Sequence, residues 1–205
     1  VETVLVGEPE ESLEREKRKF KEDLSPKSLR VWPCEGLLCD QGWIGKMEGV
    51  TVKGHYRSPR TIFGKLGEQI PDGYYFANIF LHNNDYHRIH SPIRARIKET
   101  EHLPGELVVL RPWIYRDAPS LPAFRNERMN LLLQVENENE PWFLSIVGGP
   151  AVGSIQLKEK VKEKGSVECG EELGTFLLGS TLCLAAPLKD HPLKVGSRVT
   201  PGLPI

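Results

Sequence analysis

The stretch GTFLLGSTLCL, residues 174–184, is an apolar run that is interrupted near its centre by Gly179, Ser180 and Thr181. Its two halves have the composition of β-strands, and a glycine inside such a pattern marks a bulge or a close approach of backbone. The arrangement also places the Ser180 hydroxyl directly after the unshielded carbonyl of Gly179. With a base nearby, such a serine can convert the amide into an ester, and β-elimination then splits the chain and leaves a pyruvoyl group. A core strand with a glycine bulge is the alternative interpretation.

Beyond residue 28 the sequence consists of short β-rich runs separated by Gly, Pro, Asn and Asp. This texture predicts a mainly β (α+β) fold, in which antiparallel strands form a barrel or a sandwich. Within this part only residues 59–67 indicate a helical interlude. The candidate strands are residues 37–38, 49–52, 74–81, 93–98, 106–110, 129–135, 142–147, 154–157 and 175–184.

The first 28 residues differ from the rest. Pro9–Leu24 is rich in Glu, Lys and Arg and predicts a peripheral helix with a narrow apolar stripe. We therefore divide the chain into a helical appendage, residues 1–28, and a β domain, residues 29–205. A membrane-surface helix is the alternative, but the mixed charge argues against it because such helices usually carry a basic polar face.

Composition limits the partners and the setting. Lys and Arg number 27 against 28 acidic residues, a balance that gives no reason to expect nucleic acid. The four cysteines are too few and too irregular for a disulfide framework, and a zinc site at Cys34 and Cys39 would lack a second pair. No run approaches the length of about 18 apolar residues that a membrane span needs. We expect a cytoplasmic chain without a transmembrane segment; peripheral membrane contact and a homodimer stay open.

Four blocks of the sequence resemble, in order, the motifs of phosphatidylserine decarboxylases, and the resemblance runs from about Val31 to the C-terminus. In that family a serine of the chain becomes a pyruvoyl group. The resemblance implies self-cleavage between Gly179 and Ser180, His90 as the base for that cleavage, and His87 as a group needed for decarboxylation. The implied substrate is phosphatidylserine, which becomes phosphatidylethanolamine. The blocks are DYHRIHSP (85–92), FRNER (124–128), VGGPAVGSI (147–155) and GEELGTFLLGST (170–181).

His87 and His90 are three positions apart, a spacing that places two side chains on opposite faces of an extended strand. We therefore predict different roles for them, both suited to an imidazole that exchanges protons near neutral pH. A metal site built from His82, His87 and His90 is the alternative. It lacks a completing carboxylate or cysteine pattern, and pyruvoyl chemistry needs no metal.

One position departs from the family at the implied catalytic site. The family's Pro-Ala-Asp-Gly turn is Pro33-Cys34-Glu35-Gly36 here, so Glu35 takes the place of the aspartate that orients the base. A carboxylate displaced by about 1 Å can cost on the order of a hundredfold in rate. We therefore expect slower cleavage than with aspartate, and acceleration by Glu35→Asp. Asp40 is an alternative orienting group.

A second departure bears on the substrate. The family's Tyr-Leu-Ser-Pro-Arg segment is replaced by FLHNN, residues 80–84, which removes a hydroxyl and a cation. Arg125, Arg128 and Phe80 are candidate substrate contacts, since arginine suits an anionic headgroup. The substrate is therefore either a phospholipid or another molecule that contains an amino acid. A non-catalytic relative that stays uncleaved is the competing hypothesis, favoured by Glu35 and opposed by the retention of Ser180 and both histidines.

Overall fold

The computed structural model describes residues 29–47, 50–52, 55–106, 120–136, 138–149, 153–177 and 180–205. The helix expected at Pro9–Leu24, and with it the appendage of residues 1–28, lies outside the described residues. The predicted strand at 106–110 also falls outside them, except for Glu106.

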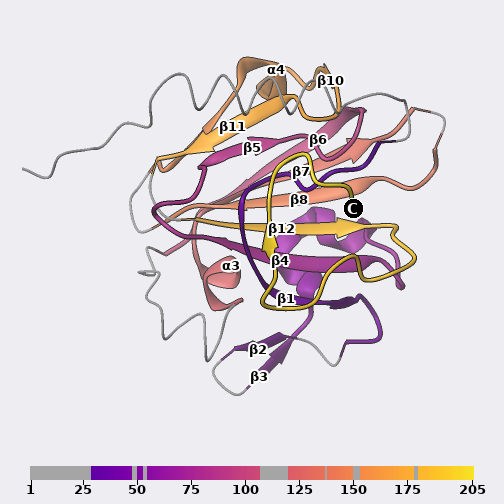
Figure 1. Ribbon diagram of the computed structural model, residues 1–205, viewed down its shortest axis with the longest axis vertical. Helices are drawn as coiled ribbons and strands as arrows, with labels where there is room; N and C mark the ends of the chain where they lie inside the picture. Colours follow the sequence, from indigo (N-terminus) through magenta and orange to yellow (C-terminus); the bar gives the residue numbers. More distant parts are fainter. Residues whose placement is uncertain are drawn as a thin grey trace, which may run out of the picture.

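An eight-stranded sheet forms the body of the protein, and every pair of neighbouring strands in it is antiparallel (Figure 1). The predicted mainly β antiparallel fold is therefore confirmed. Two very short strands form the edges, so the described strands make an open sheet and not a closed barrel. In spatial order the strands are Ser166–Val167 (β10), Ala95–Leu103 (β6), Arg128–Gln134 (β7), Trp142–Val147 (β8), Ser180–Ala186 (β12), Tyr75–Leu81 (β4), Gly36–Trp43 (β1) and Arg198–Val199 (β13).

One face of this sheet packs against a three-stranded sheet with the order β5-β11-β9, which consists of Arg88–His90, Glu172–Phe176 and Ile155–Leu157. Ile79 and Leu81 of β4 share a buried cluster with Ile89 of β5 and Leu173 of β11. We call this face of the large sheet the site face. The two layers form a sandwich-like arrangement, one of the two predicted from the sequence.

The other face, which we call the helix face, is covered by the 3-10 helix η1, Pro59–Gln69, and by α3, Leu121–Arg125. Phe76 and Phe143 point to this side and pack with Phe63 of η1. The central strands are apolar on both faces because both faces are covered. Two further elements lie outside these layers: the α4 helix Glu159–Lys162, and a ribbon of β2 (Val50–Val52) and β3 (His55–Arg57).

The helical interlude predicted at residues 59–67 corresponds to η1. The Ser58 hydroxyl accepts a hydrogen bond from the Arg60 N–H at 3.3 Å at its start. Gly64 interrupts the helix with φ 57°, a left-handed conformation that glycine adopts without strain.

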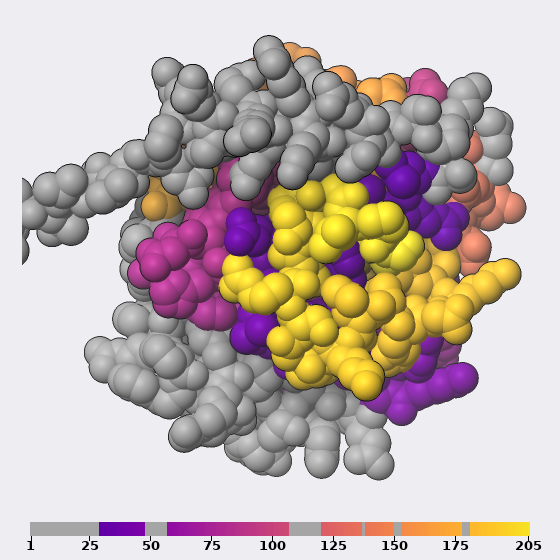
Figure 2. Space-filling model, in the orientation of Figure 1, coloured from indigo at the N-terminus to yellow at the C-terminus, as the bar shows by residue number. Residues whose placement is uncertain are grey.

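The apolar stretch 174–184 is divided between the two layers. Its first half belongs to β11 of the small sheet, and its second half is β12, a central strand of the large sheet. The chain therefore passes from one sheet to the other between Phe176, the end of β11, and Ser180, the start of β12. The segment after β12 crosses the site face, pairs with β1 through β13, and ends beside Arg30 and Val31; it is the yellow region in the middle of Figure 2.

Candidate active site

The start of β12 lies beside the end of β4, where Ser180 is paired with Leu81. β4 continues directly into residues 82–87, which we call the histidine turn, and then into β5. β5 pairs with β11, so His90 lies opposite Glu172. The strands on both sides of the predicted cleavage point therefore border the segment that carries His87 and His90. Gly179 and the Ser180 side chain lie outside the described parts of the chain, so the cleavage atoms stay a prediction.

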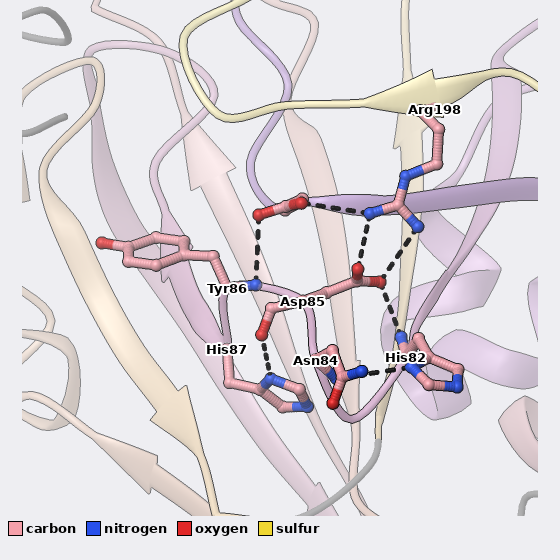
Figure 3. Close-up of polar contacts among 7 residues, drawn as sticks. His82, Asn84, Asp85, Tyr86, His87 and Arg198 are labelled. Atoms are coloured by element: carbon pink, nitrogen blue, oxygen red, sulfur yellow. Dashed lines mark hydrogen bonds and ion pairs between the residues drawn. The ribbon is translucent and has the colours of Figure 1, made fainter. Parts of the chain in front are cut away.

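Asp85 closes the histidine turn (Figure 3). Its N–H donates to the His82 carbonyl at 2.8 Å, and its carboxylate accepts the His82 N–H at 2.7 Å. The Asp85 side chain is only 8% exposed. A reciprocal pair of hydrogen bonds of this kind fixes the backbone of a tight turn.

The imidazole of His87 is oriented by the same turn. Its Nδ1 lies 2.5 Å from the Asp85 carbonyl oxygen (Figure 3). A carbonyl can only accept, so the His87 proton is on Nδ1 and the neutral ring keeps a lone pair on Nε2. That nitrogen can take up or release a proton without disturbing the bond to Asp85.

His90 is held at both ring nitrogens. Nδ1 donates to the Gly170 carbonyl at 2.8 Å, so Nε2 accepts a hydrogen bond from the Tyr86 hydroxyl at 3.1 Å. The two rings stack with centroids 5.7 Å apart and an angle of 11° between their planes. Burial lowers the pKa of His90 from 6.5. The hydrogen bond to Gly170 raises this pKa, but the effect of burial is larger. His90 is thus kept neutral near pH 7, as a base must be.

Glu35 contacts the histidine turn from the residue before β1. Its carboxylate accepts the Tyr86 N–H at 3.1 Å and binds Arg198 of β13 at 3.0 Å. From the sequence we expected a carboxylate to orient His90, but the group at Nδ1 of His90 is the Gly170 carbonyl. Orientation of the base by Glu35 stays a prediction.

This chain is similar to known proteins of one family. The family profile described as phosphatidylserine decarboxylase matches residues 11–205. The chain belongs to the phosphatidylserine decarboxylase family. A phosphatidylserine decarboxylase proenzyme of Verminephrobacter eiseniae (strain EF01-2) is 31% identical over 195 residues, which cover 85% of this chain and 67% of that protein. The corresponding proenzyme of Methylibium petroleiphilum is 33% identical over 176 residues, or 77% of this chain and 61% of the relative. The proenzyme of Chromobacterium violaceum is 34% identical over 184 residues, which cover 79% of this chain and 65% of that protein.

The aligned part spans between 58% and 67% of the length of these and similar curated relatives. In the part of the chain that the structure describes, no helix has the length and apolar character needed to cross a membrane. All four cysteines are free thiols.

The two arginines suggested by the family blocks are both engaged within the protein. Arg125 is paired with Glu106. Arg128 is buried, at 8% exposure, and its guanidinium donates to the carbonyls of Ile62 at 2.7 Å and Asn126 at 3.1 Å. Arg128 is therefore a buried residue and Arg125 forms an ion pair at the surface, and a role in substrate binding stays a prediction for both.

Phe80 and Asp40 occupy neighbouring rows of the large sheet. Phe80 is paired with Thr181, next to Ser180. Its ring and the His82 ring form a T-shaped contact with their centroids 6.4 Å apart. The Asp40 carboxylate accepts from the Ser120 hydroxyl at 3.0 Å, at the start of α3 on the helix face. Because β5 lies on the opposite face, this placement disfavours Asp40 as an orienting group for His90.

Three contacts of the site were missed from the sequence: Tyr86 and Gly170 on His90, and Arg198 on the turn. Tyr86 stands in the same family block as both histidines, so its position was an available signal. Gly170 contributes a backbone carbonyl, which leaves no trace in a sequence. Arg198 lies in a C-terminal segment rich in glycine and proline, and nothing around it in the sequence indicates a partner.

Proposed function

We propose that this chain is a pyruvoyl-dependent decarboxylase that cleaves itself between Gly179 and Ser180 and converts phosphatidylserine to phosphatidylethanolamine. The observation that carries the proposal is the convergence of Ser180, His87 and His90 at one edge of the two sheets. Ser180 begins a strand beside Leu81, and the segment that follows Leu81 carries His87 in the histidine turn and His90 in β5, both with hydrogen-bonded ring nitrogens. Family membership supplies the reaction class.

In the proposed cleavage, His90 removes the hydroxyl proton of Ser180, and the oxygen attacks the Gly179 carbonyl carbon. The C–N bond breaks as the C–O bond forms, and the serine nitrogen takes up the proton. Loss of the Cα proton of residue 180 then expels the Gly179 carboxylate. Water replaces the nitrogen of residue 180, which leaves as ammonia. The base needs the Nε2 lone pair, to which the Tyr86 hydroxyl donates, so this hydroxyl must either swing away or relay the proton.

A pyruvoyl group at residue 180 fits the position. β12 is paired with β4 along Ser180–Ala186 and with β8 along Thr181–Ala185, so its first residue stays fixed after the chain is cut. Once formed, such a group would supply an electron-withdrawing carbonyl that accepts the electrons released when CO2 leaves the substrate. The part of this chain is to hold β12 in place and to return a proton from Nε2 of His87 to the α-carbon.

A phospholipid substrate requires the site to meet a lipid surface. Leu177, three residues before Ser180, is a large apolar side chain with 58% exposure. We infer that it takes part in peripheral membrane contact. Leu177→Gln is expected to weaken flotation with phosphatidylserine vesicles, whereas the same change at Val195, which is 56% exposed, serves as the control.

The decisive test is intact-mass analysis of wild type and Ser180→Ala, followed by CO2 release from phosphatidylserine and from free serine. We expect wild type to yield chains 1–179 and 180–205, the smaller one lighter by one ammonia than a peptide that begins with serine. Ser180→Ala should stay whole. A split Ser180→Ala chain would exclude this chemistry, and an intact wild-type chain would identify an uncleaved, non-catalytic relative. Release from serine alone would assign another substrate.

A further inference from the structure

One guanidinium and two carboxylates meet at the histidine turn (Figure 3). The Arg198 Nη2 atom lies 2.5 Å from Oδ1 of Asp85 and 3.0 Å from Oε1 of Glu35, and its Nη1 lies 3.2 Å from Oδ2 of Asp85. The backbone of Arg198 is fixed by the pairing of β13 with β1, opposite Leu37. Asp85 is almost fully buried whereas Arg198 is 51% exposed, so the cation closes the carboxylate off from solvent.

Each carboxylate also holds a backbone N–H of the turn: Asp85 that of His82, and Glu35 that of Tyr86. Asp85 and Tyr86 in turn orient the two histidines. The carbonyl of Asp85 binds Nδ1 of His87, while the ring and hydroxyl of Tyr86 contact His90. The placement of both imidazoles therefore depends on the peptide units that the two carboxylates fix.

We propose that Arg198 is a positioning residue of the site, which clamps Asp85 and Glu35 and so aligns His87 and His90 with the start of β12. The proposal deepens the function given above and rests on it. It also explains the glutamate at position 35, whose longer side chain spans from the Tyr86 N–H to the guanidinium. After cleavage Arg198 belongs to the smaller chain and both carboxylates to the larger one, so the clamp joins the two products.

The charge of the clamp affects the histidines. Without Arg198, the negative charges of Asp85 and Glu35 are no longer balanced, and unbalanced negative charge raises the pKa of a nearby imidazole. Other charged groups face His90 from the neighbouring elements: Glu172 on β11 pairs with Arg88 on β5 at 2.8 Å and with Lys158 at 3.0 Å. Further titratable side chains nearby are His82 and Tyr86 in the turn and Cys34 before β1.

The first experiment measures self-cleavage and decarboxylation against pH in Arg198→Gln, Arg198→Lys and the control Arg94→Gln. Arg94 forms a comparable exposed ion pair with Glu168, at 3.4 Å. Arg198→Gln should lower both rates by about 10- to 100-fold, since misplacement by about 1 Å has effects of this size. Lysine restores the charge but not the two-pronged contact, so Arg198→Lys should recover only part of the rate.

The pH profile separates positioning from general loss of structure. Burial holds the pKa of His90 below 6.5, so the acid limb of wild type should lie below pH 6.5. Arg198→Gln should move that limb to higher pH, Arg198→Lys should return it, and Arg94→Gln should leave it in place. Unchanged rates and an unchanged limb in Arg198→Gln would overturn the clamp.

A second experiment needs no activity. In the uncleaved Ser180→Ala chain, NMR titration of the histidine rings should show a higher pKa for His90 after Arg198→Gln. Glu35→Gln, which removes a negative charge at the same length, should shift it in the opposite direction. If wild type proves inactive but these shifts appear, the proposed function fails and the clamp stands; absent shifts in both variants overturn the clamp alone.

Discussion

The two faces of the large sheet hold their polar side chains in opposite ways. On the helix face a row of polar residues runs in register across five strands, from β1 to β7, and its members are hydrogen-bonded to neutral groups, except for the Ser145 hydroxyl and the Asn130 carbonyl oxygen, which have no partner among the described residues. At the edge of the site face the polar groups are charged, partly exposed and joined by ion pairs (Figure 3). The row consists of Asp40, Asn78, Cys183, Ser145 and Asn130.

The difference follows from solvent. A buried polar group without a hydrogen bond costs free energy, so the Ser120 hydroxyl, which accepts from Asn78 at 2.8 Å and donates to Asp40, contributes to folding. Histidines that exchange protons need lone pairs within reach of a substrate. We therefore expect substitutions on the helix face to change the free energy of unfolding, and substitutions at the site edge to change rates.

The largest effect should come from the two histidines. His90→Ala is expected to block self-cleavage, since the base is gone. His87→Ala should still cleave but decarboxylate about 10²- to 10⁴-fold more slowly, the usual contribution of a general acid or base. Mass spectrometry and CO2 release measure the two steps separately. The same phenotype in both variants would show that the division of labour is wrong.

A matched pair of arginines tests the helix face against the surface. Arg128→Met leaves the carbonyls of Ile62 and Asn126 without their charged donor and should lower the free energy of unfolding by about 2–4 kcal/mol. Arg125→Met removes only a surface ion pair and should cost at most about 1 kcal/mol. Urea unfolding of the uncleaved Ser180→Ala chain measures both.

A different result would give Arg128 a role in the active site instead of a role in stability. If Arg128→Met were as stable as its parent but slowed decarboxylation with little effect on cleavage, the guanidinium would be a substrate contact. Loss of stability with normal turnover in the folded fraction would leave it a structural residue.

Glu35→Asp distinguishes the sequence-based expectation from the geometry. From the sequence, aspartate restores the family residue and should accelerate cleavage. In the structure, a shorter side chain cannot reach both the Tyr86 N–H and Arg198 without a backbone shift, so we now expect cleavage to slow by about tenfold. A time course on denaturing gels decides the sign; acceleration would mean that Glu35 is a misplaced orienting group and not part of a clamp.

The sequence predicted the sheet better than its edges. Residues 74–81 and 142–147 were recognisable as strands because they are apolar on both faces, whereas β5, β10 and β13 have only two or three residues and exist through their pairing. The site divides in the same way. His87, His90 and Ser180 stand in family blocks, but Arg198 meets Asp85 across 113 positions of the chain, a contact that only the fold creates.

The smallest expected effects are those of two serine substitutions on the helix face, and they should differ in sign. Ser120→Ala removes the bonds to Asn78 and Asp40 and should destabilise the chain by about 1 kcal/mol. The Ser145 hydroxyl is buried and has no hydrogen-bond partner among the described residues. Because an unpaired buried hydroxyl costs free energy in the folded state, Ser145→Ala should be neutral or stabilising by up to about 1 kcal/mol. If the row acts through its hydrogen bonds, urea unfolding in the Ser180→Ala chain should show changes of opposite sign in the free energy of unfolding of the two variants. Equal destabilisation by both would instead mean that Ser145 is bonded to a water held within the row, and that water would then count as part of the buried network.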